Sequence, residues 1–86
     1  MPDVEWRQTR HQVARGTRPD AQDGDRVYLF KNVSTLRATY QIRLLTYMAA
    51  RRGAVLIIEV PRYCEVMPSL ARYLKSNRGH IRLERV

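Results

Sequence analysis

The chain has 86 residues and a formal net charge of +8, from 16 basic and 8 acidic side chains. This length suits one domain with a modest core, and an apolar fraction of 44% fits a folded chain rather than a disordered one. The longest apolar run, Ala54–Ile58, is too short to span a membrane, and the single Cys64 excludes an internal disulfide and a cysteine metal cluster.

The positive charge is concentrated in the second part of the chain. Residues 1–26 carry five Arg and five acids, whereas residues 27–86 carry eleven bases against Glu59, Glu65 and Glu84. Fourteen of the sixteen bases are Arg, whose planar guanidinium suits two-pronged contacts with phosphate. The charge therefore favours a polyanionic partner, with nucleic acid first and acidic proteins or anionic lipid next. A basic surface that only keeps the domain soluble is the alternative.

The first elements along the chain are an arm and a hairpin. Residues 1–17 are polar and weakly patterned, so they are predicted to form an N-terminal arm or, within His11–Thr17, an edge strand. The Asp-Gly pair in residues 21–25 predicts a tight turn, because it supplies the positive φ that such a turn needs. A strand over Arg26–Asn32 follows. Its predicted faces are Val27, Leu29 and Lys31 on one side and Tyr28 and Phe30 on the other.

The remaining elements alternate between helix and strand. Ser34 or Thr35 is predicted to cap a helix that runs to about Arg52 and is ended by Gly53. The β-rich apolar run over residues 54–60 predicts a strand buried on both faces. Pro68 opens a second helix that ends near residues 77–79, and residues 81–86 predict a last strand. This order implies parallel strands with right-handed crossovers, and hence an α/β domain over residues 18–86.

Several short motifs in order resemble the PD-(D/E)xK, or restriction-endonuclease-like, nuclease superfamily. They are Arg18-Pro19-Asp20, the Asp-Gly turn, Val27-Tyr28-Leu29-Phe30-Lys31-Asn32-Val33, and Tyr40-Gln41-Ile42-Arg43. The pattern is similar to that of the toxin domains at the C-termini of bacterial polymorphic toxins, and the segments 53–61, 68–70 and 79–83 resemble their final strand, helix and strand. The resemblance implies a restriction-endonuclease-like core, with a mixed sheet of three to four strands and two helices.

The resemblance also implies a function and a site. The domain would be a toxin that cleaves nucleic acid, DNA favoured, with Mg²⁺ or Mn²⁺ polarising the phosphate and activating a water. Asp20 would be a metal ligand, Lys31 would orient or activate the water, and Gln41 would support the site. Gln41 has a second interpretation from its place in the apolar arc of its helix, as a core amide bonded to the backbone.

The sequence departs from the family pattern at the second acid. Leu29 stands where the motif has Glu or Asp, and Leu44 stands where the family has an acid after Gln-Ile-Arg. Because Leu cannot bind a metal, the chain is expected to be an impaired nuclease, whether as a natural relic that binds without cutting or as an inactivated version. Alternatively, another carboxylate replaces the missing acid. Glu59 is the best candidate for this second metal ligand, ahead of Asp23 and Asp25, although a Glu near a strand end also commonly points to solvent.

The expected partners and the place of action follow from the positive charge and from the family resemblance. The candidate contacts to nucleic acid are Arg18, Arg37, Arg43 and Arg62. An acidic immunity protein is a second expected partner, and no membrane is expected. Because the sequence shows no signal-peptide pattern after Asp3, action in the cytoplasm is expected. If the domain is a toxin, this would be the cytoplasm of a target bacterial cell, after delivery as part of a larger effector. The alternative function is a non-catalytic basic module that binds nucleic acid or protein.

Overall fold

The computed structural model describes residues 18–86, so the arm or edge strand predicted for residues 1–17 lies outside the described residues. The described part of the chain contains six strands and two helices. In chain order these are β1 (Ala21–Asp23), β2 (Arg26–Phe30), β3 (Thr35–Leu36), α2 (Tyr40–Arg51), β4 (Val55–Val60), β5 (Glu65–Val66), α3 (Pro68–Ser76) and β6 (Ile81–Arg85).

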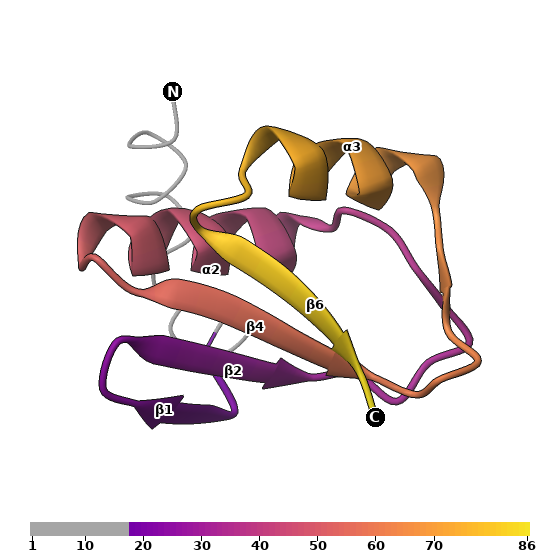
Figure 1. The fold of residues 1–86 in the computed structure, drawn as a ribbon, viewed down its shortest axis with the longest axis horizontal. Helices are drawn as coiled ribbons and strands as arrows, with labels where there is room; N and C mark the ends of the chain where they lie inside the picture. Colours follow the sequence, from indigo (N-terminus) through magenta and orange to yellow (C-terminus); the bar gives the residue numbers. More distant parts are fainter. Residues whose placement is uncertain (1–17) are drawn as a thin grey trace.

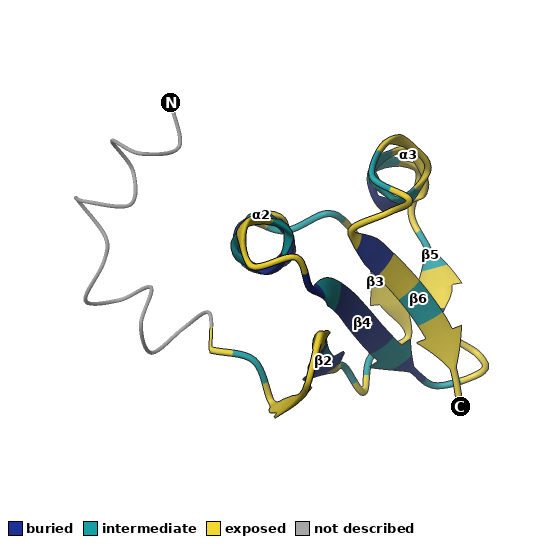
Figure 2. Cartoon of the chain, turned by 60° about the vertical axis from the view of Figure 1, so that its left-hand side comes forward, coloured by how far each residue is buried: buried dark blue, intermediate teal, exposed yellow. Residues whose placement is uncertain are grey.

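The main sheet has the strand order β1-β2-β4-β6 (Figure 1). β1 pairs with β2 in an antiparallel hairpin, whereas β2, β4 and β6 are parallel. The chain crosses from β2 to β4 through α2 and from β4 to β6 through α3. Right-handed crossovers that advance in one direction place both helices on the same face of the sheet, as Figure 2 shows. The predicted α/β class, with a mixed sheet of three to four strands and two helices, is confirmed, and this sheet has four strands.

The hairpin closes through Gly24 and Asp25. The register pairs Asp23 with Arg26, which leaves these two residues as the turn. Gly24 has φ +62°, and a positive φ at the first of two central residues is the feature of a type II′ turn, which favours glycine. The turn predicted from the Asp-Gly pair is therefore confirmed at Gly24 and Asp25, but its predicted start at residue 21 is wrong, because Ala21–Asp23 pairs with β2 as strand β1.

The core lies between the helices and one face of the sheet. The strand side chains on this face join those of both helices in one apolar cluster, whose members include Val27, Leu29, Leu56, Ile58, Ile81, Ile42, Leu45, Ala49 and Leu70. On β4, Ile57 points away from the helices and is nevertheless only 2% exposed. The prediction that this strand is buried on both faces is confirmed at its centre.

The first helix starts later than the sequence predicts. α2 begins at Tyr40, and its N-cap is Thr39, whose hydroxyl accepts a hydrogen bond from the Ile42 N–H at 3.3 Å. The cap predicted at Ser34 or Thr35 is wrong, because Thr35–Leu36 forms β3 and pairs in parallel with β5. Leu36 is buried in the core, so tertiary pairing outweighs the local cap signal.

The second helix follows the prediction closely. Pro68 stands in the first turn of α3, and the backbone N–H of its C-cap Asn77 donates to the carbonyls of Tyr73 and Leu74. Neither described helix is long and apolar enough to cross a bilayer.

Candidate functional site

Asp20 lies against the strand that carries the motif. Its backbone N–H donates to the Tyr28 carbonyl at 2.8 Å, and its Oδ2 accepts from the Phe30 N–H at 2.7 Å. The exposed Asp20 carboxylate is thus fixed beside the carboxyl end of β2, one residue before Lys31. The structure brings the Pro-Asp motif next to the motif strand, although one carboxylate oxygen already serves as a backbone acceptor.

Leu29, at the position of the family acid, belongs to the core. It is 2% exposed and lies in the apolar cluster beneath the helices. The register places it beside Ile58 of β4. A carboxylate at this position would be buried among apolar side chains rather than presented to a bound metal.

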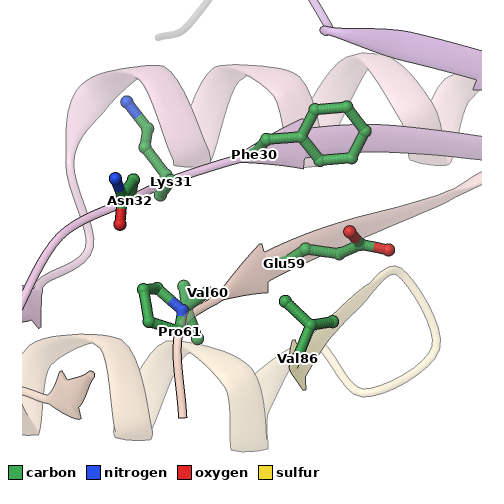
Figure 3. Close-up of a pocket in the computed structure, with 7 residues that line it drawn as sticks. All are labelled: Phe30, Lys31, Asn32, Glu59, Val60, Pro61 and Val86. Carbon is green, nitrogen blue, oxygen red and sulfur yellow. The ribbon is translucent and has the colours of Figure 1, made fainter. Parts of the chain in front are cut away.

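Lys31 and Glu59 share a hollow at the carboxyl end of β2 and β4, but their charged ends diverge. The Lys31 N–H donates to the Glu59 carbonyl at 2.9 Å. Both residues line an open hollow of about 330 Å³, together with Phe30, Asn32, Val60, Pro61 and Val86. Figure 3 shows the Lys31 ammonium and the Glu59 carboxylate pointing in different directions. Glu59 is the register neighbour of Phe30, so its side chain belongs to the sheet face away from the helices, opposite to that of Leu29.

The carboxylates of this end therefore do not fit the paired metal site that the resemblance implies. Within residues 18–86, no three His, Cys, Asp or Glu side chains gather as a metal site. Asp20 is held on Phe30, and Glu59 points away from Lys31. The expected Mg²⁺ or Mn²⁺ remains a prediction of the motif alone.

Gln41 and the predicted arginines are distributed over several elements. Gln41 stands in the first turn of α2 and is half buried. Arg18, Arg37 and Arg62 are exposed, Arg37 in the segment before α2 and Arg62 in the loop after β4. Arg43 is exposed on α2.

Arg43 contributes to a groove between the two helices that the sequence did not indicate. The groove encloses about 310 Å³ and is lined by Arg43 of α2 and by Ser69, Arg72, Tyr73 and Ser76 of α3. The Arg43 guanidinium carbon lies 5.6 Å from the Tyr73 ring centroid, and the Tyr73 hydroxyl donates to the Arg43 carbonyl at 3.5 Å. The spacing 69, 72, 73 and 76 would have indicated a shared polar face on α3.

The groove offers donors for an anion. Ser69 Oγ accepts from the Ala38 N–H at 3.1 Å, which leaves its own proton free to donate. The Tyr73 ring supports the Arg43 guanidinium from one side, an arrangement that favours a fixed orientation of its donors. Two guanidinium groups and two hydroxyls around one hollow can bind phosphate oxygens.

The surface of α2 and α3, named here the helix layer, carries exposed cations and no carboxylate. Neither helix contains Asp or Glu, and the exposed bases are Arg43, Arg51, Arg72 and Lys75. The opposite surface, the far sheet face, mixes charges. The register aligns Phe30 with Glu59 and Glu59 with Glu84, and Arg82 lies beside Ile57.

Arg26, on the far sheet face, has local partners. A side-chain hydrogen bond with Tyr28 raises the pKa of Arg26 above its ordinary value, and the nearby carboxylates of Asp25 and Glu84 add to the effect. The helix layer therefore differs from the far sheet face in carrying cations without any carboxylate on the same elements.

Comparison with models of known protein families, with curated proteins and with solved structures finds no match to this chain. The similarity to the PD-(D/E)xK superfamily therefore depends on the motif residues alone.

Proposed function

We propose that residues 18–86 form a nucleic-acid-binding domain that holds the phosphate backbone on its helix layer. The observation that carries the proposal is the segregation of charge: the two helices present four exposed cations and contain no acid. A surface of one sign attracts a polyanion, and releasing the counterions of nucleic acid supplies most of the affinity for such a surface.

The groove between the helices is the expected centre of this surface. Arg43 and Arg72 each present a planar donor group, and Ser69 and Ser76 add hydroxyls. Arg-phosphate contacts are often bidentate, which fixes orientation as well as adding affinity. The proposal needs no metal, so Leu29 does not count against it.

The test is a titration of fluorescently labelled DNA and RNA, followed by anisotropy over a range of salt concentrations. We expect affinity to fall steeply as salt rises. Arg43→Ala and Arg72→Ala should each weaken binding about tenfold, the loss of one charged hydrogen-bonding group. On duplex DNA each should also reduce the slope of log K against log salt by about 0.9.

Arg82→Ala is the matched control, because Arg82 is an exposed Arg on the far sheet face. It should leave both affinity and slope almost unchanged. Equal losses for Arg82→Ala and Arg72→Ala would show that binding depends on net charge rather than on the helix layer. If the domain shows no salt-sensitive binding to any nucleic acid but binds an acidic protein tightly, its partner is a protein, such as the expected immunity protein, and the proposal is wrong.

The nuclease toxin is the second candidate, and the contact between Asp20 and the Phe30 N–H favours it. This hydrogen bond holds the Pro-Asp carboxylate beside the carboxyl end of β2, one residue before Lys31. Incubation of plasmid DNA with the full chain in Mg²⁺, in Mn²⁺ and in EDTA tests it. Metal-dependent cleavage that is lost in both Asp20→Asn and Lys31→Ala would establish the nuclease, and cleavage that survives both changes would assign it to a contaminant.

A further inference from the structure

Aromatic and basic side chains alternate along one stripe of α2. Tyr40, Arg43, Tyr47 and Arg51 are spaced by three, four and four residues. At about 100° per residue they fall within an arc of about 80°, on one side of the helix. Tyr73 of α3 extends this stripe, since its ring lies 5.6 Å from the Arg43 guanidinium carbon.

The stripe faces solvent rather than the core. Tyr40 is 46% exposed, Arg43 and Arg51 are exposed, and Tyr47 is partly exposed. The buried residues of α2 are instead Ile42, Leu44, Leu45, Thr46 and Ala49. Packing against the apolar cluster accounts for Tyr73 but leaves the exposed ring of Tyr40 unexplained.

The arginines of the stripe are already placed over aromatic rings. The Arg51 guanidinium carbon lies 5.8 Å from the Tyr47 ring centroid, and Arg51 Nη1 donates to the Tyr47 hydroxyl at 3.3 Å. Arg43 takes the corresponding place over Tyr73. Each arginine of the stripe is thus held against a tyrosine ring, and Tyr40 is the most exposed ring of the stripe.

We infer that the helix layer binds single-stranded nucleic acid, with unpaired bases stacking on the stripe and phosphates bound by Arg43, Arg51 and Arg72. This inference rests on the proposed function and specifies its substrate class. Bases stack on aromatic rings and guanidinium planes only when their faces are accessible, and a duplex hides those faces. On a duplex, an exposed tyrosine contributes at most its hydroxyl to a phosphate, whereas an unpaired base can also stack on its ring.

The length of the stripe limits the site to a few nucleotides. Tyr40 and Arg51 are eleven residues apart, or about 16 Å along the helix axis at 1.5 Å per residue. At the spacing of about 3.4 Å per nucleotide of a stacked strand, this length accommodates at most about five nucleotides.

The test compares one labelled oligonucleotide as a single strand and as its duplex, in DNA and in RNA, at the same salt concentration and with the full chain. We expect the single strand to bind at least about tenfold more tightly. Tyr40→Ala should weaken single-strand binding roughly 5- to 150-fold, the range for loss of one stacked base. Tyr40→Phe, which keeps the ring, should bind like the unchanged protein.

Salt dependence separates stacking from phosphate contact. Tyr40→Ala should lower affinity without changing the slope of log K against log salt, whereas Arg43→Ala should reduce the slope on a single strand by about 0.7. Tyr63→Ala is the matched control, because Tyr63 is 69% exposed but follows β4, outside the helix layer. Thermal unfolding of each variant verifies that the exposed substitution leaves the fold intact.

The outcomes distinguish the inference from the proposed function. Duplex binding as tight as single-strand binding would overturn the inference and leave the proposed function standing. A preference for the single strand that Tyr40→Ala does not reduce would likewise overturn the inference and leave the proposed function standing. Failure of both forms to bind would overturn the proposed function itself.

Discussion

The carboxyl end of β2 and β4 and the helix layer both carry basic residues, but these have different neighbours. At the carboxyl end, Lys31 lines a largely apolar hollow together with Glu59, whose carboxylate points elsewhere. On the helix layer, Arg43 and Arg72 line a groove with hydroxyls and a tyrosine, on helices without acids. The first region resembles a nuclease motif along the chain, whereas the second brings together residues distant in the sequence into the surface proposed to bind nucleic acid.

The difference shows what a motif can establish. Order and spacing placed Asp20 and Lys31 near one strand end, and the contact of Asp20 with Phe30 agrees with that placement. The direction of each side chain depends on the pleat of the strands. Leu29 points into the core and Glu59 belongs to the opposite face, so a carboxylate pair does not form there.

Leu29→Glu tests this comparison with the largest expected effect. Restoring the motif acid buries a carboxylate in the apolar cluster, and we expect the free energy of unfolding to fall by about 3–5 kcal/mol. Urea denaturation measures the loss. Leu29→Met, which keeps volume and polarity, should cost less than about 1.5 kcal/mol. A stable Leu29→Glu protein whose melting temperature rises with Mg²⁺ would instead support a metal site at the carboxyl end.

Matched charge reversals compare the two regions directly. Arg72→Glu removes one cation from the helix layer and adds an anion, so we expect nucleic-acid affinity to fall about 10- to 100-fold at low salt. Lys31→Glu makes the same change at the carboxyl end and should alter affinity about twofold or less. Anisotropy titrations of both variants measure the two effects. A larger loss of affinity for Lys31→Glu would place the binding surface at the carboxyl end of β2 and β4.

Asp20→Ala separates a structural role of this carboxylate from a catalytic one. Loss of the acceptor for the Phe30 N–H should lower the free energy of unfolding by about 1 kcal/mol. Asp20→Asn keeps an oxygen acceptor and should recover much of this loss. The loss of unfolding free energy caused by Asp20→Ala should be the same in Mg²⁺ and in EDTA. If Mg²⁺ stabilises the unchanged protein but not Asp20→Ala, Asp20 is a metal ligand.

The sequence predicted those features that depend on local chemistry. The Gly24 turn, the apolar strand before Pro61 and the helix that starts at Pro68 each have a local physical cause, and the structure contains them. The groove was not predicted because it requires Arg43 and Tyr73, thirty residues apart, to meet across two helices. Periodicity can indicate one polar face of α3, but it cannot show which face of α2 lies beside it.

The start of α2 illustrates the same limit and yields the prediction with the smallest effect. Ser34, Thr35 and Thr39 all carry a capping hydroxyl, but only Thr39 accepts the N–H of the first turn, because Thr35 and Leu36 pair with β5. We expect Thr39→Ala to cost about 1 kcal/mol of unfolding free energy, the usual loss of an N-cap. Ser34→Ala, at an exposed position that contributes its backbone carbonyl to Glu65, should cost less than about 0.5 kcal/mol. Urea denaturation of the two variants compares them, and equal costs would mean that the Thr39 cap is not formed in solution and that the first turn of α2 frays. Such fraying would loosen Tyr40 and weaken base stacking on the helix layer, but it would not affect the carboxyl end of β2 and β4. A Thr39→Ala variant with weaker nucleic-acid binding would therefore favour the helix layer as the binding region.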